Sequence, residues 1–163
     1  MIKSLEFKKN WRCFKAGDRF EFRSGVNLIV GDQGTGKSSL ILLLREKHTQ
    51  GDRAHVKGTA VDDLVHLDYD ADETYTFWDY EKDNYRTKSH FEGDINDHVR
   101  SMFMSHGQSS LFHLGKCLKT KGVLVLDEPD TALSVTSCWV VAVRMQILGQ
   151  QGKQIIASAH NPI

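Results

Sequence analysis

The sequence has little of what would place the chain outside a reducing compartment or inside a membrane. Its three cysteines, Cys13, Cys117 and Cys138, are odd in number and far apart, which favours a reduced cytoplasmic protein over a disulfide framework. No apolar run approaches the ~20 residues that cross a bilayer. The N-terminal segment lacks the apolar stretch of a signal peptide. We therefore expect a cytoplasmic protein with no membrane partner.

An excess of charge of one sign is missing too. The chain has 21 basic and 21 acidic residues, so nothing in its charge favours unaided binding to nucleic acid or to an acidic membrane. Metal-binding spacings are also absent: there are eight histidines but no Cys-x-x-Cys and no His-Glu-x-x-His. The composition, 40% apolar and 26% charged, is ordinary for a globular protein. We expect one domain spanning residues 1–163.

A glycine-rich loop is present between an apolar run and a helical pattern. Residues 26–30 (VNLIV) predict a buried strand, and residues 39–47 (SLILLLREK) predict a helix. The loop between them, residues 31–38, matches the spacing G-x-x-x-x-G-K-[ST]. Glycines in this pattern let backbone N–H groups curl around phosphate oxygens, at a helix N-terminus that favours anions. The sequence therefore predicts a phosphate-binding loop. A chance glycine turn is the alternative, which the flanking strand and helix disfavour.

The side chains of this loop have separate expected roles. Lys37, which we place on an exposed loop, would reach the terminal phosphates of a nucleotide. The hydroxyl of Ser38 would ligate Mg²⁺. The expected nucleotide contacts are Gly31, Asp32, Gln33, Gly34, Thr35, Gly36, Lys37, Ser38 and Ser39.

A second cluster follows the all-apolar run at residues 123–126 (VLVL). A buried strand there would place Asp127 at its carboxyl end, beside the phosphate loop, where it could bind Mg²⁺ directly or through water. The adjacent Glu128 could polarise the attacking water as a general base. An isolated Asp-Glu pair after a strand is as often a solvated turn. The phosphate loop upstream favours the functional interpretation.

The rest of the chain predicts strands that alternate with helices. The other expected strands are 2–8, 19–23, 56–61, 64–69, 74–80 and 154–157, and the other expected helices are 94–104, 108–119 and 134–150. Polar loops are expected at 48–57 and 81–93. This alternation argues for an α/β fold whose mainly parallel sheet is flanked by helices on both faces.

Two further segments resemble motifs and follow the phosphate loop along the chain. Residues 104–109 (MSHGQS) precede a predicted helix, and residues 155–160 (IIASAH) form a strand pattern ending in His160. With the phosphate loop and the acidic strand, they resemble the ATP-binding-cassette ATPases over nearly the whole chain. The resemblance is greatest to the soluble SMC and RecF type and to the predicted AAA-type ATPases of bacteria and their phages.

The segment before the helix is similar to the Leu-Ser-Gly-Gly-Gln signature of that family. Ser105, Gly107 and Gln108 fall on it, with Met104 in place of Leu and His106 in place of the first Gly. The resemblance implies that these residues contact an ATP held by the other subunit, Ser105 and Gly107 at its γ-phosphate. The alternative is a plain helix cap by a serine of this segment.

The resemblance assigns further roles. His160 matches the switch histidine that contacts the γ-phosphate in the same subunit, so Glu128, His160 and Lys37 would form the catalytic group. Ser134 stands where the family has an Asp that contacts the other subunit.

Two positions stay open. For the Mg²⁺-sensing Gln of the family, the candidates are Asp79 and Glu81, and a solvent-facing acidic loop is the alternative. For adenine, the candidates are Asn10, Trp11, Arg12 and Phe14, of which Trp11 and Phe14 could equally pack in the core. The absence of the guanine-binding pattern Asn-Lys-x-Asp favours ATP over GTP.

Taken over the chain, the resemblance implies a P-loop NTPase fold with an N-terminal antiparallel β portion. Too few residues separate Lys37 from Ser105 for a coiled-coil arm, which excludes an SMC rod. The same segment is short for the full helical subdomain of transporter ATPases, so we expect that subdomain to be reduced. The implied activity is Mg²⁺-dependent ATP binding and hydrolysis by an ATP-sandwiched, head-to-tail homodimer, coupled to an unidentified protein or nucleic-acid partner. A nucleotide-gated dimerisation switch with little hydrolysis is the alternative. The family continues beyond the position of His160, so we expect a minimal or truncated version.

Overall fold

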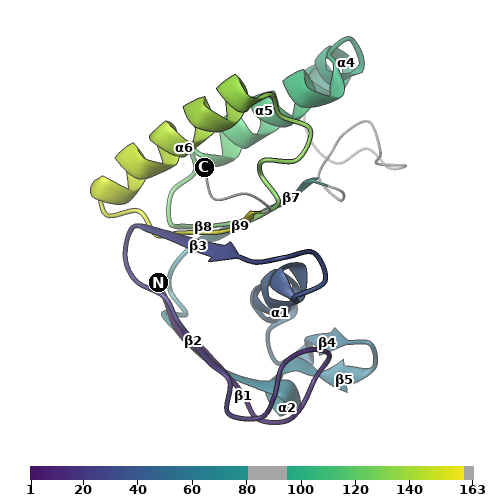
Figure 1. Ribbon diagram of the computed structural model, residues 1–163, viewed down its shortest axis with the longest axis vertical. Helices are drawn as coiled ribbons and strands as arrows, with labels where there is room; N and C mark the ends of the chain where they lie inside the picture. The colour runs from purple at the N-terminus through teal and green to yellow at the C-terminus, as the bar shows by residue number, and fades with distance from the viewer. Residues whose placement is uncertain (81–94, 160–163) are drawn as a thin grey trace.

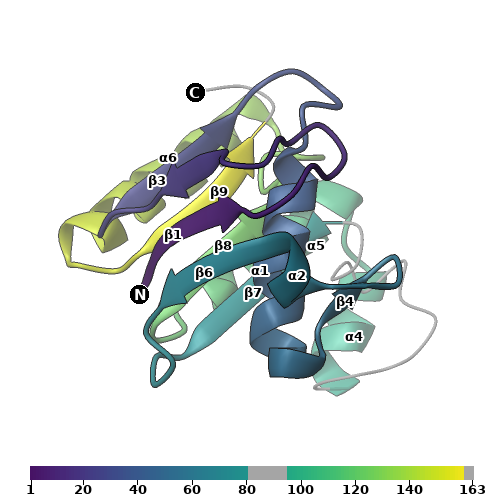
Figure 2. The ribbon, with the colours of Figure 1, turned by 90° about the horizontal axis from the view of Figure 1, so that it is seen from below.

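The strands of the computed structural model form a parallel sheet, an antiparallel sheet and a short hairpin (Figures 1 and 2). The structure describes residues 1–80 and 95–159. In Figure 1, α5 and α6 lie on one face of the parallel sheet, and α1 lies on the other face, between the two larger sheets. The mixed α/β architecture expected from the sequence is confirmed.

The parallel sheet has the strand order β3-β9-β8-β7. Its strands are β3 (Val26–Val30), β7 (Tyr75–Asp79), β8 (Val123–Asp127) and β9 (Ile155–Ala159). The register pairs Val30 with Ala159 and Asp79 with Asp127, so the carboxyl ends of all four strands meet at one edge. In open parallel sheets, ligands generally bind at this carboxyl edge.

The strand β8 explains why the sheet has helices on two sides. All four apolar residues of the run 123–126 are at most 2% exposed. Val123 and Val125 belong to the core around α1 (Lys37–Gln50), whereas Leu124 and Leu126 pack on the side of α5 (His106–Cys117) and α6 (Val135–Gln150). A strand buried on both faces reads as a continuous apolar run, as this one does.

The antiparallel sheet has the order β2-β1-β6 and confirms the expected N-terminal antiparallel portion. It comprises β1 (Ile2–Phe7), β2 (Arg19–Glu21) and β6 (Val65–Tyr69). The buried amide of Gln154, next to β9, joins this sheet to the parallel one. Its Oε1 accepts from the backbone N–H of Ile2 at 2.8 Å, and its Nε2 donates to the carbonyls of Ile2 at 2.7 Å and Arg23 at 3.1 Å.

The segment after α1 differs from the expected polar loop and single strand. The helix runs to Gln50, and the following elements are a 3₁₀ turn (Gly51–Arg53), β4 (His55–Val56), β5 (Thr59–Ala60) and α2 (Val61–Leu64). Lys57 and Gly58 both have positive φ, 48° and 80°, which is the backbone of a tight two-residue hairpin turn. A chain reversal therefore interrupts the region expected to form one strand. The helix α4 spans Ile95–Met102.

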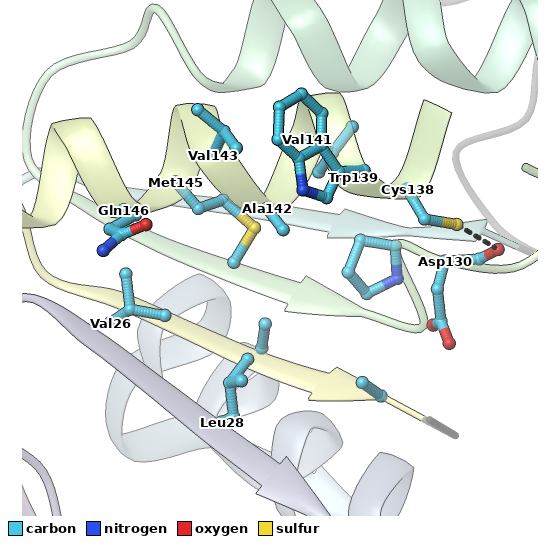
Figure 3. A pocket seen from close by; sticks show the side chains of 13 residues that line it. Val26, Leu28, Asp130, Cys138, Trp139, Val141, Ala142, Val143, Met145 and Gln146 are labelled. Carbon is cyan, nitrogen blue, oxygen red and sulfur yellow. Dashed lines mark hydrogen bonds between the residues drawn. The ribbon is translucent and has the colours of Figure 1, made fainter. Parts of the chain in front are cut away.

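One face of β3 is not covered by a helix within the described residues. Figure 3 shows the side chain of Met145 in α6 directed toward Val26 and Leu28 of β3. These three residues and Trp139 of α6 line an open groove with a volume of about 540 Å³. Val26, Leu28 and Val30 are 39–51% exposed, so the strand expected at residues 26–30 forms, but the expectation that it is buried is wrong. Among residues 1–80 and 95–159, no helix has both the length and the apolar character needed to cross a bilayer.

Candidate functional site

The phosphate loop joins β3 to α1 at the carboxyl edge of the parallel sheet. The helix begins at Lys37, and its N-cap residue, Gly36, has no side chain with which to cap the first turn. The backbone N–H groups of this turn therefore point out of the helix N-terminus, where they and the helix dipole favour an anion.

Gly36 is required here by close packing as well as by its backbone. Its φ of 96° is in the left-handed region. A Cβ atom at this position would overlap Sγ of Cys13 and would lie 2.7 Å from the ring of Phe14. The loop between β1 and β2 therefore rests directly on the phosphate loop, so the two loops hold each other in place.

Lys37 lies inside the phosphate loop. Its ammonium donates to the carbonyls of Gly31 at 2.6 Å and Asp32 at 2.9 Å, and the residue is only 6% exposed. The expectation that Lys37 belongs to an exposed loop is therefore wrong, because the residue opens α1 and is buried. Its positive charge is nevertheless held at the loop that we expect to surround phosphates.

The acidic pair lies beside the start of α1. Burial raises the pKa of the Asp127 carboxyl above its ordinary value, with the nearby charges of Asp79 and Glu128 adding to the rise. Hydrogen bonds from Ser158 and Ser38 oppose this rise. The structure therefore brings together Ser38 and Asp127, the two residues predicted as metal ligands from segments far apart in the sequence.

Glu128 follows in an unusual backbone conformation. Its φ of 51° is left-handed, which costs a residue other than glycine on the order of 1–3 kcal/mol unless its surroundings hold it there. Its N–H donates to Oγ of Ser158 at 3.0 Å, and its Oε2 accepts from Oγ1 of Thr131 at 3.4 Å. The carboxylate is half-buried.

A cleft of about 220 Å³ connects these parts. It is lined by Arg12, Ser38, Leu42, Asp79, Tyr80, Asp127 and Glu128. The oxygen atoms here, from hydroxyl and carboxylate groups, are the hard donors that Mg²⁺ prefers. Among the described residues, no three His, Cys, Asp or Glu side chains are close enough to hold a metal ion by themselves. A cation in this cleft would therefore be shared with oxygens of a ligand.

Arg12 is a cation at this cleft that the sequence suggested only as an adenine contact. Its guanidinium lies 4.6 Å from the centroid of the Trp11 ring and donates to Oγ of Ser39, beside the phosphate loop. Of the other adenine candidates, Phe14 is buried and stacks on Phe7 at 4.4 Å, so its core alternative holds. Asn10 accepts from a backbone N–H in its own turn.

Asp79, one candidate for the Mg²⁺-sensing position, lines the cleft and lies 3.6 Å from Nη1 of Arg45. The other candidate, Glu81, lies outside the described residues, and so does His160.

The signature-like segment begins α5 and is not among the residues lining the described cleft. Ser105 and Gln108 form a capping box, in which the Gln108 N–H donates to Oγ of Ser105 at 3.3 Å and the Ser105 N–H donates to Oε1 of Gln108 at 3.0 Å. A Cβ at Gly107 would lie 2.5 Å from the carbonyl oxygen of Ala132. The helix-cap interpretation therefore holds, and it leaves the expected contact with a second subunit untested.

Ser134 also has a local role. It is the N-cap of α6, and its Oγ accepts from the N–H of Ser137 at 3.2 Å. Serine and aspartate both cap helices well, so Ser134 can cap α6 at the position where the family has an Asp.

Comparison with known proteins agrees with the fold. The AAA domain family matches residues 9–45, which include the loop carrying Arg12, the phosphate loop and most of α1. No curated protein matches the chain.

Solved structures match over nearly the whole chain. A transporter described as of the metal-chelate ABC type, in an inward-facing conformation, matches with a TM-score of 0.60 and 17% identity, over 98% of this chain and 73% of that one. A nucleotide-free ATP-binding cassette from an ABC transporter gives 0.58 and 15%, over 99% and 82%. A dimeric ATP-binding cassette bound to ADP and Pi gives 0.57 and 13%, over 98% and 87%. At these identities the likeness concerns the fold.

Proposed function

We infer that this protein, which has the P-loop fold of ATP-binding-cassette ATPase domains, binds ATP with Mg²⁺ and hydrolyses it. The observation that carries this inference is the meeting of Ser38 and Asp127 at the N-terminus of α1, with Glu128 beside them. A helix N-terminus that favours phosphate, a hydroxyl and a carboxylate for Mg²⁺, and a second carboxylate for water are then within one cleft.

Positive charge on the phosphates would come from side chains on both sides of the loop. Lys37 approaches from within the loop, and Arg12 approaches from the β1–β2 loop across the cleft. Phosphoryl transfer depends mainly on positioning and on neutralising charge that spreads over the transferred group. Two fixed cations and a helix N-terminus meet that need without a covalent intermediate.

Bound Mg²⁺ would neutralise charge on the phosphate oxygens and fix their orientation. Ser38 and Asp127 would hold the ion, and the phosphates would complete its coordination, since residues 1–80 and 95–159 bring no three acidic, histidine or cysteine side chains together. Glu128 would accept a proton from the attacking water.

The alternative is a nucleotide-gated switch with little hydrolysis. It is supported by the signature-like segment, where His106 replaces a glycine and where Ser105 and Gln108 bond to each other. In both cases two copies would bury two ATP molecules in a head-to-tail dimer.

Replacement of Lys37 tests the inference directly. Lys37→Ala removes the charge at the terminal phosphates, and we expect ATP affinity measured by calorimetry to fall at least tenfold. The variant also leaves two carbonyls without their donor, so its thermal unfolding should be measured alongside. Lys119→Ala, at an exposed position after α5, is the matched control. Equal ATP affinity in Lys37→Ala and wild type would contradict the proposed function.

A further inference from the structure

We propose that Ser158 is a positioning residue that holds the Asp127 carboxylate and the Glu128 backbone in the arrangement needed for metal binding and water activation. Ser158 lies in β9, in the middle of the parallel sheet, and is fully buried. The proposal rests on the function proposed above. Ser158 lies within the strand pattern 155–160, for which the sequence indicates only His160 as a site residue.

The hydroxyl of Ser158 accepts one hydrogen bond and donates the other. A backbone N–H can only donate, so Oγ of Ser158 must be the acceptor for Glu128, at 3.0 Å. The single hydroxyl proton is then available for Oδ1 of Asp127, which lies 2.6 Å away. This short bond to a carboxylate is of the charge-assisted kind, about twice as strong as a neutral one.

The bond to Asp127 fixes one carboxylate oxygen. Without the hydroxyl, the carboxylate would lose the hydrogen bond that sets its orientation. A metal ligand needs a set orientation, because hard cations bind oxygen ligands at defined positions and outer hydrogen bonds hold those ligands in place.

The bond to Glu128 acts on the backbone. A left-handed residue persists only where its surroundings hold it, and Ser158 accepts the N–H of the strained residue itself. One hydroxyl on β9 thereby determines the direction in which both acidic side chains leave the end of β8.

A purely structural serine would give a different result. Replacing Ser158 leaves the N–H of Glu128 without its acceptor and the Asp127 carboxylate without its donor, so the fold will be destabilised under either interpretation. Positioning further requires that metal affinity and turnover fall while metal-free nucleotide binding does not, and that the loss depends on Asp127.

A double-mutant cycle on Mn²⁺ affinity separates the two interpretations. The four proteins are the wild type, Ser158→Ala, Asp127→Asn and the double variant, each titrated with Mn²⁺ in the presence of a non-hydrolysable ATP analogue and followed by electron paramagnetic resonance. We expect Ser158→Ala to weaken Mn²⁺ about tenfold and to lower turnover about 10- to 100-fold. In the Asp127→Asn background, Ser158→Ala should cause little further loss. A control, Ser110→Ala, makes the same substitution at a buried serine of α5 and should retain Mn²⁺ affinity and turnover.

Three results would overturn the proposal. The first is a Ser158→Ala protein with the Mn²⁺ affinity and turnover of the wild type. The second is an equal Mn²⁺ loss in both backgrounds, and the third is a parallel loss of metal-free nucleotide binding, since each indicates general destabilisation. A wild type that binds no nucleotide would instead contradict the proposed function, so the two failures are distinguishable.

Discussion

Glu128 combines a proposed chemical role with a backbone conformation that few residues other than glycine adopt. Its carboxylate lies beside Asp127, and its position depends on bonds to Ser158 and Thr131. A substitution that retains the shape of the side chain therefore separates chemistry from structure better than a truncation would.

Glu128→Gln is that substitution. The amide retains the side chain's size and hydrogen-bonding capacity but cannot accept the proton of the attacking water. We expect the steady-state rate of ATP hydrolysis to fall by ~10²-fold or more, with ATP affinity changed little. Unchanged turnover would mean that the base lies elsewhere, and Asp79 would be the next residue to replace.

At the residue scale, the sequence predicts site residues where they belong to a short continuous motif. The glycine spacing and the Asp-Glu pair identify Ser38 and Asp127, and the fold brings them together. The roles that we propose for Ser158 and Arg12 could not be predicted in this way, because each depends on contacts between segments distant in the sequence. His160 stays a prediction.

Among the elements, α1 links the phosphate loop at its start to an aromatic cluster near its end. The ring of His48 stacks on Tyr75 at a centroid distance of 3.7 Å and meets Tyr69 edge-on at 4.6 Å. Burial lowers the pKa of His48 to about 4, helped by the nearby N-terminal amine and the charge of Lys47. The folded protein therefore holds this histidine neutral.

The pH dependence of unfolding should reveal this histidine. In the unfolded chain His48 has its ordinary pKa, about 6.5, so the unfolded state binds the proton first as pH falls. Its contribution to stability is full above about pH 6.5 and is lost between pH 6.5 and 4, by up to about 2 kcal/mol after allowing for partial exposure.

His48→Phe retains the stacked ring without the titration, so urea unfolding of this variant should lose less stability over that range than the wild type loses. His66→Gln, at an exposed position in β6, is the control and should follow the wild-type curve. Parallel curves for His48→Phe and wild type would contradict the assignment.

Element boundaries could be predicted where burial dictates the pattern. The run 123–126 is apolar because both of its faces are covered, and β8 forms there. The hairpin of β4 and β5 was missed because its turn uses Lys57 and Gly58, a pair whose positive φ angles the local sequence indicates only weakly. The turn at these two residues thus divides a segment whose β-propensity had predicted one continuous strand.

For the whole molecule, the testable expectation is an ATP-dependent dimer. Light scattering of Glu128→Gln should give twice the monomer mass with ATP and the monomer mass with ADP or without nucleotide. Ser105→Arg should prevent the dimer by adding bulk at the start of α5. Ser105→Ala, which loses the same helix cap without adding bulk, should still dimerise. A monomer for Glu128→Gln under all three conditions would contradict the expectation.

The open groove beside β3 has a practical consequence for anyone handling the protein. Parallel sheets are ordinarily covered on both faces, yet here Val26, Leu28 and Trp139 expose apolar surface together. Sulfate and other excluded salts strengthen apolar contacts, so we expect any association of chains through this face to increase with sulfate concentration, with or without nucleotide. Measuring the oligomeric state in buffers of low sulfate concentration will therefore distinguish association through this groove from dimerisation that depends on nucleotide.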